Sequence, residues 1–196
     1  MRWFTSDLHL GHLNIIKYTE RPFYSIDQMN EAFVDNWNMH VDTADTVWVL
    51  GDVALGPIKE SLGLVELLNG HKILVPGNHD RVWRGLAPKR RWDDQIYLDA
   101  GFERIEHGDL GVYPLTLGQD IGQPQHGVLL CHFPYTVGQH DARFSPWHPT
   151  DAGVPLLHGH THSTTRVRGN MIHVGVDAWD YAPVSEEQII HLLEAL

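Results

Sequence analysis

The chain has 196 residues, of which 42% are hydrophobic and 20% are charged, an ordinary composition for a globular protein with a substantial core. Its single cysteine, Cys131, excludes an internal disulfide framework, and no apolar run approaches the length of a membrane span. The formal net charge of −11 argues against binding of long duplex nucleic acid on a basic face.

The sequence contains no internal repeat, low-complexity segment or long block of charge, so we expect residues 1–196 to form a single domain. The first residues have the pattern of a strand and leave no room for a signal peptide, which predicts a cytoplasmic location. The 15 histidines outnumber the 14 lysines and arginines together, and about half of them stand at ordered places in the pattern described next.

The first half of the chain alternates short apolar runs with helical patterns. Residues 2–6 predict a strand, and residues 13–18 and 26–40 predict helices, the second capped by Ser25. A strand at 46–50 and a helix at 58–68 follow, the helix closed by Asn69-Gly70, and then comes a strand at 72–75.

The second half is richer in strands. Residues 102–117 predict a strand pair around Gly108-Asp109, and residues 164–174 predict another pair that turns at Gly169-Asn170. Single strands are expected at 127–131 and 154–157, loops at 119–125 and 139–151, and a last helix from Ser185 to Leu193. This order of elements indicates an α/β protein with a mixed sheet or two sheets.

Polar residues follow the predicted strands where each strand ends. In α/β folds ligands collect at the carboxyl ends of strands, so these residues are expected to form one site. A lone Asp-x-His pair or Gly-Asp turn is common by chance, but a turn does not explain Asn, His and Asp in succession. The residues are Asp7, His9, Asp52, Asn78, His79, Asp80, His132, His160 and His162.

The donor atoms of this set are carboxylate and amide oxygens and imidazole nitrogens, with no thiolate. Such a mixture suits Mn²⁺, which we expect first, or Fe²⁺, Zn²⁺ or Ni²⁺, rather than a structural zinc site. Carboxylates can also bridge two divalent ions about 3.5–4 Å apart, the spacing of two-metal phosphoryl chemistry. His160 and His162, two apart on an extended segment, project to the same side and can both reach a metal.

These residues form five blocks along the chain: Asp7-x-His9, Gly51-Asp52, Gly77-Asn78-His79-Asp80, His132 and Gly159-His160-x-His162. The blocks, in this order between residues 7 and 162, resemble the calcineurin-like metallophosphoesterase superfamily. The resemblance implies a four-layer α/β/β/α sandwich of two mixed sheets flanked by helices, with the metals on loops at the strand ends. It implies one ion held by Asp7, His9, Asp52 and His162, and a second held by Asp52, Asn78, His132 and His160. It further implies that Asp52 bridges the ions, that His79 lies over the substrate phosphate, and that Asp80 orients His79.

The opening run from Ser6 to Ile16, followed by Arg21-Pro22-Phe23, is similar to a subgroup of small bacterial and phage phosphoesterases. Protein Ser/Thr phosphatases of the superfamily carry an arginine shortly after the Asp that corresponds to Asp52, and a glutamate where this chain has Asp80. The chain lacks both features, so a protein phosphatase is disfavoured.

The resulting hypothesis is a dinuclear metal-dependent phosphodiesterase in which metal-activated hydroxide attacks a small substrate such as a cyclic nucleotide. His79 would then protonate the leaving oxygen or stabilise charge in the transition state. The motifs equally permit a phosphomonoesterase or a nuclease acting on short single strands. A non-catalytic scaffold of the same fold is a third alternative, against which the intact ligand blocks argue.

Several neighbouring residues have a second interpretation. Cys131 beside His132 invites a nucleophile hypothesis, but adjacent strand residues face opposite sides, so Cys131 is expected in the core. His158 is interpreted as a hydrogen-bonded histidine near the site in preference to a ligand. Three residues just after the first ligand pair can either contact substrate or serve capping and packing: His12, Asn14 and Arg21.

Overall fold

The computed structural model describes residues 1–135 and 143–196, and within them the strands form two sheets. The first sheet has the order β10-β1-β2-β3-β4. Its strands β1 to β4 are parallel, and β10 pairs antiparallel with β1. The bounds are β1 (Arg2–Thr5), β2 (Thr46–Val49), β3 (His71–Leu74), β4 (Phe102–Ile105) and β10 (Val184–Ser185).

The second sheet has the order β5-β6-β7-β9-β8 and is also mixed. Strands β6, β7 and β9 are parallel to one another, whereas β5 and β8 pair antiparallel at the two edges. The bounds are β5 (Tyr113–Leu117), β6 (His126–Leu130), β7 (Leu156–His158), β8 (Val167–Arg168) and β9 (Met171–His173). The predicted layered α/β sandwich of two mixed sheets flanked by helices is therefore confirmed, and so is the antiparallel pair at the Gly169-Asn170 turn.

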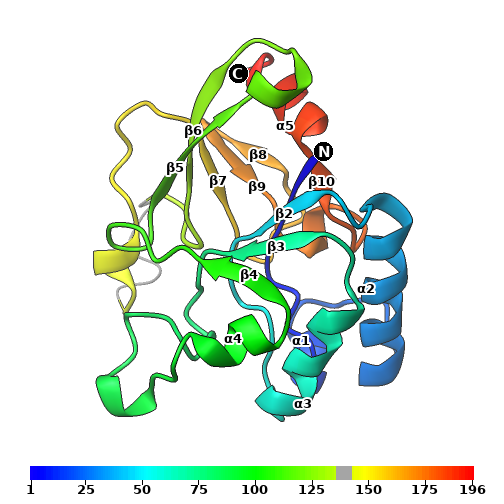
Figure 1. Ribbon diagram of the computed structural model, residues 1–196. Helices are drawn as coiled ribbons and strands as arrows, with labels where there is room; N and C mark the ends of the chain where they lie inside the picture. The colour runs from blue at the N-terminus through cyan, green and yellow to red at the C-terminus, as the bar shows by residue number, and fades with distance from the viewer. Residues whose placement is uncertain (136–142) are drawn as a thin grey trace.

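Helices cover the outer face of the first sheet (Figure 1). Val47 and Val49 of β2 point toward them, while Trp48 between these two points toward the second sheet. Burial on both faces explains why these parallel strands are continuous apolar runs. The covering elements are α1 (Leu13–Tyr18), α2 (Ile26–His40), α3 (Ile58–Gly63), the 3-10 helix η1 (Leu64–Leu67) and α4 (Gln95–Asp99).

A second core fills the space between the sheets, and the C-terminal helix α5 (Glu186–Leu193) adds Ile189 and Ile190 to it. A third cluster lies on the other face of the second sheet, where Cys131 packs with Phe133 and Trp83. The prediction that Cys131 belongs to the core is thus confirmed. The remaining short elements are the 3-10 helices η2 (Pro88–Arg90), η3 (Gln119–Ile121), η4 (Ser145–Trp147) and η5 (Val176–Ala178).

The helix boundaries follow the predicted capping residues. Ser25 accepts a hydrogen bond from the backbone N–H of Gln28 at the start of α2. Ser185 and Gln188 form a complete capping box at the start of α5. The predicted helix at 58–68 is confirmed as helical, but it is divided into the α-helix α3 and the 3-10 helix η1.

The strand pair predicted at 102–117 is wrong. Strands β4 and β5 exist, but β4 is an edge of the first sheet and β5 is an edge of the second. Gly108-Asp109 lies in the connection by which the chain passes between the sheets, with one isolated bridge between Asp109 and Val112. Turn residues between two apolar runs indicate a reversal of the chain, but they do not decide whether the two strands share a ladder.

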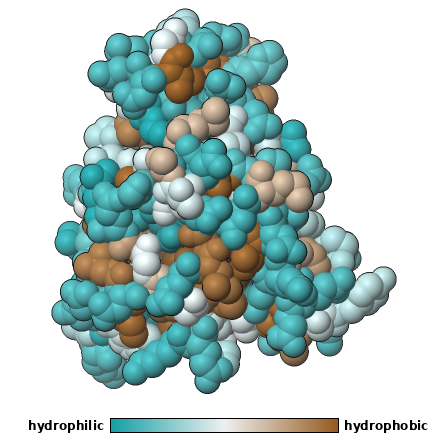
Figure 2. Space-filling model, turned by 45° about the vertical axis from the view of Figure 1, so that its right-hand side comes forward, coloured by the Kyte–Doolittle hydropathy of each residue, from teal (hydrophilic) through white to brown (hydrophobic). Residues whose placement is uncertain are grey.

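The predicted loop at 139–151 is described only from residue 143 onward, and residues 139–142 lie outside the described residues. None of the helices that the structure describes is both long and apolar enough to cross a bilayer. The face shown in Figure 2 is largely hydrophilic, with apolar side chains in separate patches.

Candidate metal centre

The predicted site residues follow the strand ends in the structure as they do in the sequence. Asp7 follows β1, Asp52 follows β2, and Asn78 to Asp80 follow β3 in the first sheet. His132 follows β6 and His160 follows β7 in the second sheet. Because these strands are parallel within each sheet, their carboxyl ends bring the residues together at one edge of the sandwich.

Two overlapping groups of side chains could hold a metal ion. The ligand atoms of Asp7, His9 and His162 lie within 4.8 Å of one another. Those of Asp7, Asp52 and His132 do so as well. The groups share Asp7 and lie side by side, so the described residues offer metal ligands from both sheets at one place.

Asp52 belongs to the second group and also lies beside His9 of the first. Its Oδ2 is 3.5 Å from Nε2 of His9 and 3.5 Å from Nε2 of His132. Its other oxygen, Oδ1, accepts a hydrogen bond of 2.9 Å from the backbone N–H of His79, which fixes the carboxylate plane. One carboxylate oxygen thus faces imidazoles of both groups, as a bridging ligand requires.

Asn78 and His160 complete the predicted set on the side of His132. Oδ1 of Asn78 lies 3.0 Å, and Nδ1 of His160 lies 3.3 Å, from Nε2 of His132. The backbone N–H of His160 donates to both carboxylate oxygens of Asp7, at 3.1 and 2.9 Å. The structure therefore brings all seven predicted ligands together, while their binding of an ion stays a prediction.

The backbone at the site is strained. Five of the seven predicted ligands have a positive φ, a conformation that costs a non-glycine residue of order 1–3 kcal/mol and gathers at functional sites. The loops also pack closely: a Cβ on Gly51 would lie 2.3 Å from the backbone N of Gly77. The five ligands are Asp7 (59°), His9 (52°), Asp52 (55°), His160 (69°) and His162 (50°).

The electrostatics of the site fit a bound cation. Asp7 and Asp52 are 0% and 2% exposed. Burial, together with the carboxylates of Asp80 and Asp7, raises the pKa of Asp52 well above its ordinary value. Nε2 of His9 is buried without a hydrogen-bond partner. A buried polar atom of this kind destabilises the folded state unless it binds something else, such as a metal ion. A divalent cation would satisfy this nitrogen and neutralise the carboxylates together.

His79 lies at the open side of the cluster. Its side chain is 42% exposed, and its Nε2 is 4.0 Å from Oδ2 of Asp52. Burial, followed by the neighbouring His12 and His160, lowers the pKa of His79 to about 4. The ring is therefore neutral near pH 7 and is accessible from solvent, unlike His9 and His132, which are 2% and 1% exposed.

The hydrogen bonds of Asp80 in the described residues differ from the role that the resemblance implied, because its carboxylate bonds to backbone N–H groups and a tyrosine and not to the His79 ring. Its Oδ2 accepts from the backbone N–H groups of Asp52 and Gly77, each at 2.8 Å. Its Oδ1 accepts from the N–H of Val53 at 3.0 Å and from the hydroxyl of Tyr97 at 3.3 Å. Asp80 is fully buried and links the two ligand loops that follow β2 and β3, so its observed contacts are structural.

The residues with two interpretations divide as follows. His158 is buried, and its Nδ1 lies 2.9 Å from the carbonyl oxygen of Gly159, as expected of a hydrogen-bonded histidine. His12 makes no capping hydrogen bond, and its Nδ1 is 3.3 Å from Nδ1 of His9. Asn14 is exposed on α1, and Arg21 is 3% exposed and packs inside.

The sequence did not reveal Asp177, in η5, as part of the site. Its Oδ2 lies 2.8 Å from Nδ1 of His162. Burial alone would lower the pKa of His162, but the hydrogen bond to Asp177 and the negative charges of Asp7 and Asp177 together outweigh burial and raise this pKa above its ordinary value. Asp177 follows β9 and thus also stands at a strand end, which is the one sequence signal that it offers.

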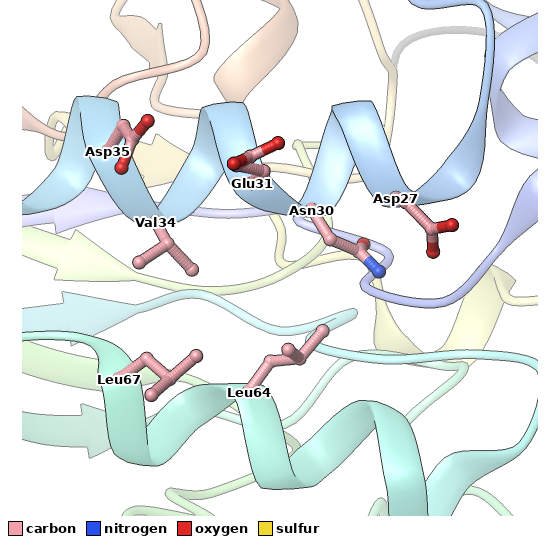
Figure 3. Close-up of a pocket in the computed structure, with 7 residues that line it drawn as sticks. All are labelled: Asp27, Asn30, Glu31, Val34, Asp35, Leu64 and Leu67. Carbon is pink, nitrogen blue, oxygen red and sulfur yellow. The ribbon is translucent and has the colours of Figure 1, made fainter.

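A surface groove of about 360 Å³ lies elsewhere, between α2 and η1. Val34 points across it toward Leu64 and Leu67 (Figure 3). None of the predicted site residues lines it. The remaining lining residues are all on α2: Asp27, Asn30, Glu31 and Asp35.

Comparisons with known proteins find phage proteins that are similar to this chain over nearly its whole length. It is 38% identical over 194 residues to the gene 66 protein of Mycobacterium phage D29, covering 94% of this chain and 92% of that protein. It is 34% identical to the gene 66 protein of Mycobacterium phage L5, covering 97% and 93%. No protein-family profile matches the chain.

Among solved structures, the chain resembles AQ665 from Aquifex aeolicus, which is described as a protein of unknown function. The TM-score is 0.66 at 24% identity, and the superposition covers 98% of both chains. At this level of identity the likeness shows the fold, and it supports the layered sandwich described above.

Proposed function

The chain belongs to the family of the mycobacteriophage gene 66 proteins, and we propose that it is a metal-dependent phosphoric ester hydrolase with a calcineurin-like centre of two divalent ions. The observation that carries the proposal is Asp52, whose single oxygen Oδ2 lies 3.5 Å from an imidazole nitrogen on each side. Mn²⁺ is our first choice of metal, and Fe²⁺, Zn²⁺ and Ni²⁺ suit the same donors.

The proposed ligand sets are those of the sequence hypothesis. Asp7, His9, Asp52 and His162 would hold one ion, and Asp52, Asn78, His132 and His160 would hold the other. When bound, such ions polarise phosphoryl oxygens and lower the pKa of water toward neutrality. The lowered pKa values of Asp7, His9 and His132 give these three side chains the protonation states that ligation needs. The pKa values of Asp52 and His162 are raised, so binding of ions there would displace protons.

His79 is the residue proposed to act on the leaving group. Its side chain is exposed at the open side of the centre and is not enclosed among the ligands. With a pKa of about 4, the His79 ring is neutral in the free protein. In that state it can donate a hydrogen bond to the leaving oxygen but cannot act as a general acid. An anionic phosphate beside the ring would raise this pKa. His79 would then carry a proton for the leaving oxygen only while substrate is bound.

A small phosphodiester is the proposed substrate. Arg21, which lies against the centre, is buried and donates to protein acceptors, so it adds no hydrogen bond to an incoming phosphate. A diester carries one negative charge per phosphate and needs less compensation than a doubly charged monoester. This difference favours a diester such as a cyclic nucleotide over the phosphomonoesterase alternative.

The test measures hydrolysis of two synthetic esters by protein from which EDTA has removed the metal. Without added metal neither bis(p-nitrophenyl) phosphate nor p-nitrophenyl phosphate should be hydrolysed. Added Mn²⁺ should restore hydrolysis, with the larger kcat/KM for the diester. Full activity of the metal-free protein would contradict the metal requirement, and a preference for the monoester would contradict the substrate class. Tight binding of two ions without turnover of either ester would favour the non-catalytic scaffold.

A further inference from the structure

A buried ion pair lies behind one half of the candidate centre. Arg21, in the segment between α1 and α2, donates from Nε to Oδ1 of Asp177 at 2.8 Å and from Nη2 to Oδ2 at 3.0 Å. Both side chains are enclosed, at 0% and 5% exposed. A bidentate pair of this kind is rigid and directional, and removal of one partner leaves a buried charge uncompensated.

The ion pair contacts both loops that carry the first group of ligands. Arg21 donates from Nη2 to the carbonyl oxygen of Asp7 at 2.8 Å and from Nη1 to that of Leu8 at 3.1 Å. Asp177, at the other end of the pair, lies 2.8 Å from Nδ1 of His162. Asp7 and His162 both have a positive φ, so the pair braces loops that are strained where they meet.

The contact between Asp177 and His162 determines which nitrogen of His162 is free. A carboxylate can only accept, so Nδ1 of His162 must carry the proton, and Nε2 keeps its lone pair for a metal. An anion behind a ligating imidazole also increases its basicity toward a cation.

The other half of the centre is built differently. Nδ1 of His132 lies 2.8 Å from the carbonyl oxygen of Leu50, a neutral acceptor from the backbone. Within the described residues, Arg21 and Asp177 contact one another, the carbonyl groups of Asp7 and Leu8, and the side chain of His162. Arg21 also packs against Met29 and Phe33, and neither member of the pair bonds to His132 or Asn78. The two groups of ligands thus have different support: a buried ion pair behind the first, and a peptide carbonyl behind His132.

We propose that Asp177 and Arg21 are positioning residues that set the tautomer of His162 and give the Asp7–His9–His162 group its ion affinity, independently of the His132 side. The inference rests on the proposed function, because it assigns support to one of two proposed ions. The two ions should consequently respond differently to a change at Asp177.

The experiment uses Asp177→Asn, which removes the charge but keeps the size of the side chain. Its matched control is Asp180→Asn, because Asp180 lies three residues away with its side chain 98% exposed. Titration of metal-free protein with Mn²⁺ should show two ions per chain in the wild type and in the control. In Asp177→Asn one of the two should bind roughly 10–100-fold more weakly, and the other should be unchanged. Equal weakening of both ions, or of neither, would overturn the proposal.

A second measurement needs no metal. Imidazole ¹⁵N NMR of metal-free protein at pH 8 reports which nitrogen of His162 carries the proton. The wild type should show the Nδ1–H form, and Asp177→Asn should show a mixture of tautomers. An unchanged tautomer in a folded variant would overturn the positioning role, whereas failure of the wild type to bind two ions would instead contradict the proposed function. If Asp177→Asn is unstable, Arg21→Lys supplies the test, since it weakens the brace on Asp7 and keeps the positive charge.

Discussion

Gly77→Ala would place a methyl group where the ligand loops leave no room. The added Cβ would lie 2.4 Å from Oδ1 of Asp52, 2.7 Å from Nδ1 of His132 and 2.8 Å from the backbone N of Asp52. Two of these contacts are with proposed ligands and the third is with backbone, so relief requires movement of the bridging carboxylate or of its loop. The φ of Gly77 is not in the left-handed region, so the expected effect is steric and not conformational.

Overpacking of this kind costs about 1–3 kcal/mol. In a domain of about this size each kcal/mol lowers Tm by roughly 2–4 °C, so a fall of about 2–12 °C is expected. Gly127→Ala in β6 is the control, because a Cβ there meets nothing within 4 Å. That change should be neutral or stabilise the protein by about 0.4–1 kcal/mol through the unfolded state.

The assay is thermal unfolding of the metal-free proteins, followed by measurement of bound Mn²⁺ per chain. Gly77→Ala should melt at a lower temperature than the wild type and bind fewer than two ions. Gly127→Ala should melt at or slightly above the wild-type temperature and bind two ions. If Gly77→Ala has the same Tm as Gly127→Ala and retains two ions, the close packing of the Asp52 and Asn78 loops is not required for stability or for ion binding.

Three further changes, and Tyr97→Phe as a comparison for the third, test individual roles. Asp52→Asn should leave fewer than two ions per chain by metal analysis, because a shared carboxylate supports both; two tightly held ions would remove Asp52 from the bridge. His79→Ala should retain both ions yet lose roughly 10²–10⁴-fold in rate. The loss should be smaller with p-nitrophenolate, which needs little protonation, and loss of an ion would make His79 a ligand. Asp80→Ala should lower the free energy of unfolding by several kcal/mol. It leaves three buried backbone N–H groups without an acceptor, and each such loss costs about 1–3 kcal/mol. Tyr97→Phe removes one hydrogen bond and should cost only about 1 kcal/mol in the same denaturant titration.

The ligands could be predicted from the sequence because each one lies within four residues after the end of a strand. Asp7 and Asp52 end apolar runs that are buried on both faces, and parallel strands carry their ends to the same edge. Continuous runs of this kind are a local signal, and so are the caps at Ser25 and Ser185. The elements and the edge on which the site lies could therefore be predicted.

The support of the site was not predictable in the same way. Asp177 becomes significant only because η5 brings it to His162, and Arg21 only because its side chain turns inward to reach Asp177. Asp80 follows His79 directly, yet its carboxylate points to backbone groups of another loop. Adjacency in sequence places two residues near each other but does not determine the direction of their side chains. The placement of β4 and β5 in different sheets is likewise not determined by their closeness in sequence, because it depends on which sheet has an open edge for each strand.

The passage of the chain from one sheet to the other also bears on how the protein is made. Strands β1 to β4 lie within the first 105 residues, and they carry Asp7, Asp52 and Asn78. The partners from the second sheet emerge from the ribosome several seconds later at a synthesis rate of about 5–20 residues per second. Until then the inner face of the first sheet, with Phe4 and Trp48, has nothing to cover it. A chain that stops early therefore exposes an apolar sheet face and carries only four of the seven proposed ligands, which makes it a substrate for chaperones and proteases.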